Sequence, residues 1–352
     1  MNINELLSQM LVENASDLHI SVEYPPMIRK HGELLKMNNN ILKAEFVRQS
    51  IFSLLTNDEK KLLDKNLQLD LAIDLKGIGR FRVNVFHERH GLGITFRAIS
   101  NSIKSIEELE LPESLNNIAS FHQGLVLVTG PTGSGKSTTL AAIVNQVNQN
   151  CKKHIITLED PIEFIYEGIN SEIHQRELGT HMHSFSDGLK AALREDPDII
   201  LVGELRDFDT ISLALTAAET GHLVFGTLHT SSAIQTINRI IDIFPVSQQS
   251  QIRTQLAESI KVIIAQKLYP RTDKDGLIPV VEILISTPAV SNLIREGKTF
   301  QIPSIIQTGL RYGMQSFKQS LQNLIKKEII SEEYINIQAS TILTNGGNHE
   351  EN

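Results

Sequence analysis

The stretch LVLVTGPTGSGKSTTL, residues 125–140, decides how the larger part of this chain folds. Its centre fits the pattern G-x-x-x-x-G-K-[ST], which Gly130 opens and Ser137 closes. The apolar run before Gly130 predicts a buried strand, and the Ala-, Leu- and Val-rich residues after Ser137 predict a helix. A glycine-rich loop between a strand and a helix turns backbone N–H groups toward one point at the helix N-terminus. The stretch therefore predicts a loop that binds the phosphates of a nucleoside triphosphate.

The positions of this loop have different predicted roles. We expect Lys136 to reach the outer phosphates of ATP and the Ser137 hydroxyl to ligate Mg²⁺. The alternative is a glycine-rich turn that binds nothing, which we disfavour because every motif position is filled and both flanks fit. The predicted phosphate-binding set is Gly130, Thr132, Gly133, Ser134, Gly135, Lys136, Ser137 and Thr138.

Composition narrows the class of protein. The 352 residues suggest two domains. A net charge of −8, no tryptophan and 5% aromatic residues argue against a nucleic-acid partner, which usually meets a basic face and stacking aromatics. The single cysteine, Cys151, excludes a disulfide framework and a multi-cysteine zinc site. Because no integral membrane segment and no signal-peptide pattern are found, we expect a cytoplasmic protein.

Residues 1–100 predict an α+β domain. We expect a helix over 3–11, a strand over 17–22, a hairpin turning at 31–32, a helical segment around 47–55, and strands over 67–75, 80–86 and 94–99. Alternation in the last strands places Arg82 and Arg97 away from the core. Exposed arginines are usually only solvated surface. The polar residues 101–118 predict a linker.

From residue 119 strands and helices alternate, which predicts a parallel sheet covered by helices and hence an α/β ATPase domain over 119–341. The sequence of residues 172–183 is typical of a loop. Residues 247–340 are predicted to be mostly helical, with a short strand around 280–285. The polar tail 342–352 is predicted to be disordered. The expected strands are 124–129, 154–158, 198–202 and 222–227, and the expected helices 136–148, 184–194 and 208–219.

Acidic and histidine side chains follow three of these strands. Glu163 comes after the strand over 154–158, Glu204 after the strand over 198–202, and His229 after the strand over 222–227. Ligands of parallel sheets bind at this carboxyl edge. We expect Glu204 to hold Mg²⁺ and Glu163 to orient the attacking water, although the sequence also allows the reverse. His229 is a candidate sensor of the γ-phosphate.

Other polar residues are more ambiguous. Glu159 and Asp160 fit either a site role or local capping. His174, His181 and His183 could suggest a metal site, which we disfavour because no cysteine is close and the segment is loop-like.

Several motifs together resemble the secretion and pilus ATPase superfamily, the GspE/PulE-like P-loop ATPases, and within it the type IV pilus retraction ATPases. They are ASDLH at 15–19, PPMIR at 25–29, ALREDPDIILVGE at 192–204 and AAETGHLVFGTLHTSS at 217–232. The four-cysteine zinc motif and extra N-terminal domain of pilus assembly ATPases have no counterpart. In the C-terminal signature, Ser291 stands where these ATPases usually have arginine, and Arg295 is retained.

This resemblance implies a PAS-like N-terminal domain followed by a RecA-like ATPase domain. It implies a homohexamer that hydrolyses ATP with Mg²⁺ to retract type IV pili, at an inner-membrane platform protein of the pilus base. Arg82 and Arg97 would then reach the nucleotide. Two alternatives stay open: a type IV secretion or conjugation ATPase that moves DNA or protein, and a non-hydrolysing ring. Intact Lys136, Glu163 and Glu204 argue against the second.

Overall fold

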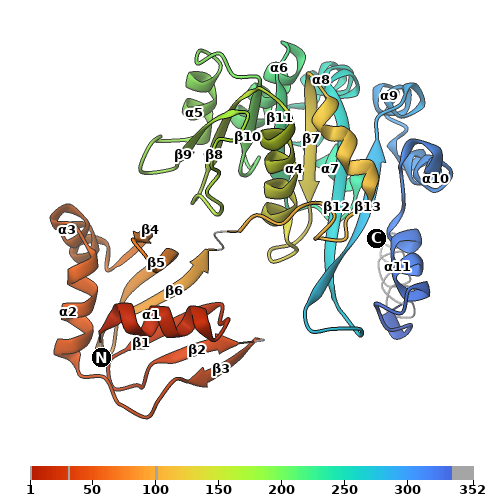
Figure 1. Cartoon of the computed structure of the whole chain (residues 1–352). Helices are drawn as coiled ribbons and strands as arrows, with labels where there is room; N and C mark the ends of the chain where they lie inside the picture. Colours follow the sequence, from red (N-terminus) through yellow and green to blue (C-terminus); the bar gives the residue numbers. More distant parts are fainter. Residues whose placement is uncertain (1, 31, 100–101, 335–352) are drawn as a thin grey trace, which may run out of the picture. The chain divides into compact units, whose positions relative to one another are not determined.

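The computed structural model describes residues 2–30, 32–99 and 102–334, which form two compact units (Figure 1). The first unit comprises Met1–Ser102 and the short segment Pro161–Ile165, and the second Ile103–Asp160 and Tyr166–Asn352. The predicted tail, 342–352, lies outside the described residues. No described helix is long and apolar enough to cross a membrane.

The first unit is a six-stranded antiparallel sheet with strand order β3-β2-β1-β6-β5-β4 and three helices. The predicted strands and hairpin are confirmed, and the single helical segment expected around 47–55 is followed by a second helix. The elements are α1 (Ile3–Val12), β1 (Asp17–Ser21), β2 (Met27–Lys30), β3 (Glu33–Lys36), α2 (Ala44–Leu54), α3 (Asn57–Asn66), β4 (Gln68–Leu75), β5 (Gly79–Glu88) and β6 (Gly91–Ile99).

One face of this sheet is apolar and the other polar. Phe81 in β5 and Phe96 in β6 are buried, with their rings edge to face at 6.0 Å. They belong to a core that includes apolar residues of α1, α2 and α3. Arg82 and Arg97 alternate with these aromatics and are exposed. The period of two in the strands therefore separates a packed face from a charged one.

The second unit is built on a seven-stranded sheet with order β13-β12-β7-β11-β10-β8-β9. All neighbouring strands are parallel except β13, which runs antiparallel to β12. The strands are β7 (Gly124–Thr129), β8 (His154–Glu159), β9 (Glu172–Glu177), β10 (Ile199–Val202), β11 (Leu223–Leu228), β12 (Ile260–Pro270) and β13 (Leu277–Ile285).

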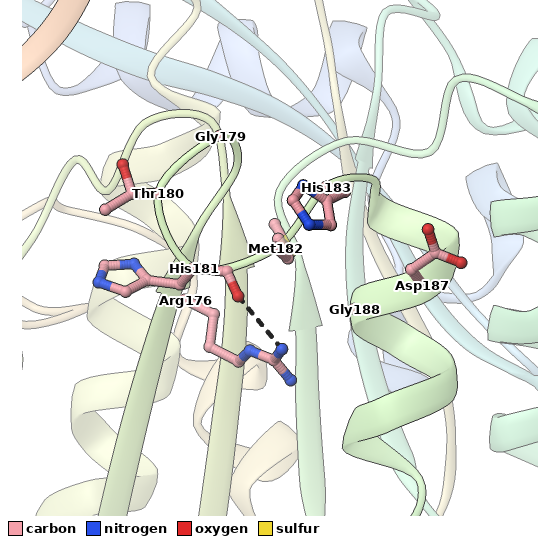
Figure 2. Close-up of a pocket in the computed structure, with 8 residues that line it drawn as sticks. All are labelled: Arg176, Gly179, Thr180, His181, Met182, His183, Asp187 and Gly188. Carbon is pink, nitrogen blue, oxygen red and sulfur yellow. Dashed lines mark hydrogen bonds between the residues drawn. The ribbon is translucent and has the colours of Figure 1, made fainter. Parts of the chain in front are cut away.

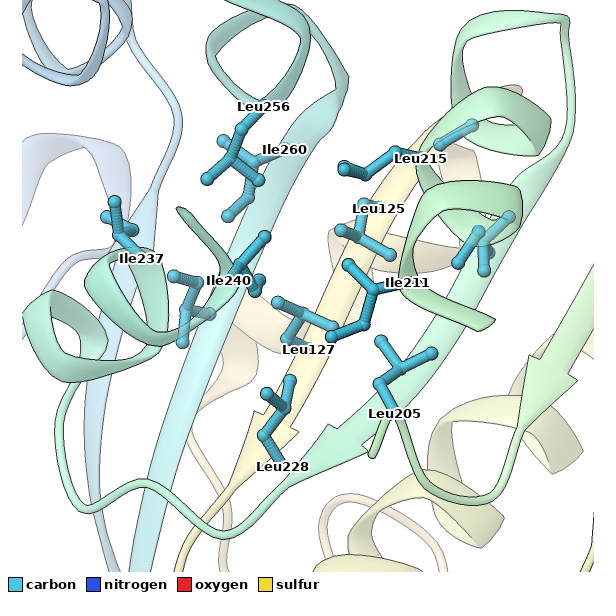
Figure 3. Close-up of a cluster of buried hydrophobic side chains, with 14 of the residues drawn as sticks. Leu125, Leu127, Leu205, Ile211, Leu215, Leu228, Ile237, Ile240, Leu256 and Ile260 are labelled. Atoms are coloured by element: carbon cyan, nitrogen blue, oxygen red, sulfur yellow. The ribbon is translucent and has the colours of Figure 1, made fainter. Parts of the chain in front are cut away.

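Helices cover both faces of this sheet. Leu125 and Leu127 of β7 point into a core formed with α5 to α10 (Figure 3), whereas Val126 and Val128 point into a core formed with α4 and a 3₁₀ turn, η1. A strand buried on both faces has an unbroken apolar sequence, as β7 does. The helices are η1 (Glu113–Ser120), α4 (Lys136–Asn150), α5 (Phe185–Ala192), α6 (Phe208–Glu219), α7 (Ala233–Asp242), α8 (Val246–Ser259), α9 (Pro288–Arg295), α10 (Ile302–Thr308) and α11 (Phe317–Lys326).

Two strands were not expected from the sequence. Residues 260–270, predicted to be helical, form β12, which pairs with β7 on one side and β13 on the other. Its apolar run is buried on both faces, so it lacks the alternation that marks a half-buried strand. Residues 172–177, predicted to be loop, form the edge strand β9. Five of its six residues are polar and only Ile173 is apolar, so composition does not identify it as a strand.

Residues 103–120, most of which were assigned to a linker because of their polarity, pack on the second unit. Ile106, Leu111, Leu115 and Ile118 are all buried in the core that α4 shares with the sheet. These four apolar side chains are therefore enough to hold a segment that is polar on average against the core of the second unit.

The position of β12 inside the sheet gives a stability prediction. Ile263 and Ile264 are fully buried in cores on opposite faces. Ile263→Ala and Ile264→Ala should each lower the free energy of unfolding by about 2–5 kcal/mol, because each leaves a cavity. Leu277→Ala, at a position of β13 that is 58% exposed, is the matched control and should change it by less than about 0.5 kcal/mol. Urea unfolding measures all three, and a neutral result at either isoleucine would contradict burial on both faces.

Candidate nucleotide site

The phosphate-binding loop connects the end of β7 to the start of α4, as the sequence predicted. Gly130 has φ 149°, and a Cβ there would lie 2.3 Å from the carbonyl oxygen of Gln266 in β12. Gly135 is the N-cap of α4 with φ 81°, a left-handed conformation that favours glycine. Both ends of the loop therefore require glycine, for their backbone conformation and for their close approach to Gln266.

Lys136 and Ser137 are the first two residues of α4 and are half-buried. The Lys136 ammonium donates hydrogen bonds to the carbonyl oxygens of Gly130 at 2.9 Å and Pro131 at 3.0 Å. The Lys136 ammonium thus lies across the loop. The backbone N–H groups of the loop and the N-terminus of α4 also favour an anion. The Ser134 hydroxyl is buried and has no hydrogen-bond partner within the described part of the chain.

Glu204 follows β10 and is held by hydrogen bonds of its two neighbours in the chain. The Gly203 N–H donates to the Leu158 carbonyl at the end of β8, and the Leu205 N–H donates to the Thr227 carbonyl in β11. The Thr227 hydroxyl also donates to the Gly203 carbonyl. Glu204 is therefore fixed between the carboxyl ends of two parallel strands, at the edge where sequence analysis placed it.

The Glu204 carboxylate has two basic neighbours. Arg206 lies 2.6 Å from Oε2, and Nε2 of His229 lies 3.3 Å from Oε1. Burial raises the pKa of Glu204, but the hydrogen bond and charge of Arg206, together with His229, outweigh burial and hold this pKa below its ordinary value. The carboxylate is consequently ionised at neutral pH, as a ligand for a divalent cation must be. The predicted residues Glu204 and His229 are in contact.

Hydroxyl groups join the His229 loop to the base of the phosphate-binding loop. Thr230 and Thr236 share a hydrogen bond of 2.6 Å, and the Thr236 hydroxyl lies 3.5 Å from that of Thr129. Thr129 is the last residue of β7 and immediately precedes Gly130. The two loops are thus connected through a buried polar chain.

The remaining predicted carboxylates are not all placed together. Glu159 ends β8, is 9% exposed, and accepts hydrogen bonds from Thr157 at 2.7 Å and Gln175 at 3.2 Å. This arrangement favours local structure for Glu159. Glu163 is exposed and lies in the segment Pro161–Ile165 that groups with the first unit. Its assignment to the attacking water stays a prediction.

Arg82 and Arg97 face each other across β5 and β6 of the first unit, where their Cα atoms are partners in the register. Arg97 also forms an ion pair of 2.8 Å with Asp17 of β1, a carboxylate that is 5% exposed. Like charges directly opposite in a sheet are destabilising. Arg82 therefore lies opposite an arginine whose own charge is paired with Asp17, on a face that also carries Asp70 and Asp74 of β4.

Of the histidines considered for a metal, His174 lies in β9, and His181 and His183 lie in the loop that follows this strand. A hollow of about 250 Å³ there is bounded by the loop between β9 and α5 (Figure 2). Nδ1 of His181 accepts a hydrogen bond of 3.0 Å from the Glu177 N–H, and the His181 carbonyl accepts one of 3.3 Å from Arg176. Over residues 2–30, 32–99 and 102–334, no three His, Cys, Asp or Glu side chains are grouped to hold a metal ion.

Two contacts of the site, made by Arg206 and Gln266, were not predicted from the sequence. Arg206 lies two residues after Glu204, so charge alternation near the strand end could have indicated it. Gln266 touches the phosphate-binding loop but lies 130 positions after Lys136 (266 − 136 = 130), on a strand that was predicted as helix. No local pattern indicates such a residue.

The described residues fit a nucleotide with a bound cation. The loop from Gly130 to Gly135 has no room for larger side chains at either end. The N-terminus of α4 and the Lys136 side chain adjoin this loop. Ser137 and the ionised Glu204 carry oxygen atoms of the kind that Mg²⁺ prefers as ligands. Ser137 lies one residue after Lys136 in the first turn of α4.

Comparison with known proteins identifies the family of this chain. The family model for type II/IV secretion system proteins matches residues 1–278. The chain is 49% identical over 308 residues to the twitching motility protein of Neisseria gonorrhoeae, covering 88% of this chain and 82% of that protein. It is 46% identical over 333 residues to the type IV pilus retraction ATPase PilT of Pseudomonas aeruginosa, covering 95% and 96%.

Solved structures are similar over the same extent. The crystal structure of the pilus retraction motor PilT with bound ADP superimposes with a TM-score of 0.89 at 41% identity, covering 95% of each chain. The ATPase DotB of Legionella pneumophila gives a TM-score of 0.84 at 31% identity, covering 96% of this chain and 95% of that one. The chain therefore belongs to the type II/IV secretion system protein family.

Proposed function

We propose that this chain is an ATP-hydrolysing motor that powers type IV pilus retraction and hence twitching motility. The observation that carries the proposal is the match to PilT of Pseudomonas aeruginosa along 95% of this chain and 96% of that protein. The contact of Glu204 with His229 at the edge of the sheet supports hydrolysis rather than nucleotide binding alone. A cytoplasmic motor would meet a platform protein of the inner membrane at the pilus base.

The chemistry follows from the placement of the side chains. Lys136 and the loop N–H groups would bind the outer phosphates, and Ser137 with Glu204 would hold Mg²⁺, which neutralises charge that develops on the phosphates. Glu163 would orient the attacking water and His229 would contact the γ-phosphate. Phosphoryl transfer depends mainly on positioning and on charge stabilisation, so each of these groups acts without forming a bond to the substrate.

Lys136→Ala should reduce ATP turnover by roughly 10²–10³-fold, because it removes a charge that stabilises the transferring phosphate. Lys326→Ala, at an exposed lysine in the last turn of α11, is the matched control and should retain full turnover. Phosphate release by the purified, folded proteins measures both. Wild-type turnover by Lys136→Ala would refute the assignment of the site.

The same pair of variants tests the cellular role. Cells with Lys136→Ala should display surface pili that do not retract, and they should lose twitching, whereas cells with Lys326→Ala should twitch normally. Loss of secretion with normal pilus retraction would instead favour the secretion ATPase alternative.

The two carboxylates are distinguished by their dependence on Mg²⁺. Glu204→Gln removes a cation ligand, so it should weaken ATP binding in the presence of Mg²⁺ and leave binding without Mg²⁺ nearly unchanged. Glu163→Gln should leave Mg²⁺-dependent binding intact and abolish turnover. Nucleotide titrations with and without Mg²⁺ decide between them, with Glu258→Gln on the exposed side of α8 as the control. The opposite pattern would exchange the two roles.

We further propose that the motor is a homohexamer in which Arg82 and Arg97 complete the nucleotide site. The position of the two arginines opposite each other on the exposed face of β5 and β6 supports this role, because anionic phosphates would relieve the repulsion between them. Arginines that reach the phosphates in other P-loop enzymes raise turnover by about 10³–10⁵-fold.

Arg97→Ala should therefore depress turnover far more than nucleotide affinity, since its charge matters most in the transition state. Arg48→Ala, which removes an arginine that lies over the Phe52 ring in α2, is the control. If the arginine serves a neighbouring subunit, mixing Arg97→Ala with Glu163→Gln should restore part of the activity. Light scattering gives the assembly directly, and a monomer that hydrolyses ATP at full rate would contradict the ring.

A further inference from the structure

Gln266, in the middle of β12, makes two hydrogen bonds to the phosphate-binding region. Its side-chain N–H donates to the Ser134 carbonyl at 2.7 Å, and its side-chain oxygen accepts from the Thr139 hydroxyl at 2.8 Å. The side chain is 2% exposed and Thr139 is 1% exposed. One amide thus uses its donor on the loop and its acceptor on the first turn of α4, so neither end can be exchanged for the other.

The loop also surrounds Gln266 at close range. A Cβ at Gly130 would lie 2.3 Å from the Gln266 carbonyl oxygen, and a Cβ at Gly135 would lie 2.9 Å from the Gln266 side-chain nitrogen. The first and last glycines of the motif therefore contact the same residue. Their requirement for glycine arises partly from Gln266 itself.

The bond to Ser134 fixes a donor of the loop. The Ser134 carbonyl and the Gly135 N–H belong to one planar trans peptide, in which the two groups point in opposite directions. A carbonyl held toward β12 consequently holds the Gly135 N–H away from β12. The bond to Thr139 fixes the first turn of α4, which begins with Lys136.

We propose that Gln266 is a positioning residue for the nucleotide phosphates, which sets the loop N–H groups and the start of α4 before the ligand binds. It contacts the loop and the helix and is not a catalytic residue. The proposal concerns nucleotide affinity alone, so it stands or fails independently of the role in pilus retraction.

The neighbouring strand supports the other side of the site in a similar way. Ala265, next to Gln266, pairs with Glu282 of β13. The Glu282 carboxylate accepts a hydrogen bond of 2.8 Å from the N–H of Ala233, the first residue of α7. Because α7 follows the His229 loop, the β12–β13 pair contacts elements on both sides of the nucleotide site.

The test compares ADP and ATP binding to purified full-length variants by calorimetric titration with Mg²⁺. Gln266→Met keeps the length of the side chain but removes both hydrogen bonds, and should weaken binding of both nucleotides by about tenfold. Gln266→Glu should weaken binding further, because it turns a carboxylate toward the Ser134 carbonyl inside an anion site. Thr139→Val should give a smaller loss in the same direction, and Thr139→Ser should bind as the wild type does.

Ser320→Ala is the matched control for loss of a buried hydrogen bond. The Ser320 hydroxyl is 5% exposed and accepts a bond of 3.2 Å from the Val281 N–H in β13, without contact to the loop. It should lower the thermal unfolding midpoint and leave nucleotide affinity unchanged. A purely structural Gln266 would behave in the same way.

Unchanged ADP affinity in folded Gln266→Met overturns the proposal, and so does an equal loss of affinity in Ser320→Ala. If Gln266→Met does not fold, the comparison of Thr139→Val with Thr139→Ser decides. Equal affinity of those two variants overturns the proposal, and weaker binding by Thr139→Val alone supports it.

Discussion

The backbone of Gly130 lies so close to the carbonyl oxygen of Gln266 that no side chain fits between them, and this contact between the first residue of the loop and β12 constrains the geometry of the site. It requires glycine at the start of the loop, where β12 lies alongside β7. The loop can then turn back over the sheet into α4. Burial of β7 on both faces holds the strand in register, so the loop begins at a fixed point.

Positive and negative groups of the site come from different elements of the sheet and its helices. The loop, the start of α4 and Lys136 favour anions, whereas Glu204 presents an ionised carboxylate at the end of β10. Arg206 and His229 keep that carboxylate ionised even though it is partly buried. The loop is therefore suited to an anionic ligand, and the Glu204 carboxylate to a cationic one.

How far the sequence predicts this molecule depends on whether each signal is local. The loop from Gly130 to Ser137 follows from adjacent residues, and the unbroken apolar run of β7 identifies a strand buried on both faces. Strand β12 has a similar run, but it was assigned to a helix because its partners, β7 and β13, are not evident from its own sequence. Periodicity cannot separate a buried strand from a buried helix segment.

Site residues divide in the same way. Glu204 and His229 follow apolar strands, so their shared edge could be predicted, and the structure places them in contact. Gln266 acts through the pairing of β12 with β7, which no neighbouring residue encodes. Arg82 and Arg97 show alternation along their strands, but their register opposite each other depends on how β5 and β6 pair.

The order of strands in the sheet has a consequence for synthesis on the ribosome. Strand β7 pairs with β11 and β12. Because β12 ends at Pro270, its synthesis is completed long after the loop residues have left the ribosome. The loop sequence is therefore translated well before the two strands that flank it. A nascent chain that ends before β12 lacks one of the strands that contact the phosphate-binding loop. The complete nucleotide site can therefore form only after nearly all strands of the parallel sheet have been synthesised.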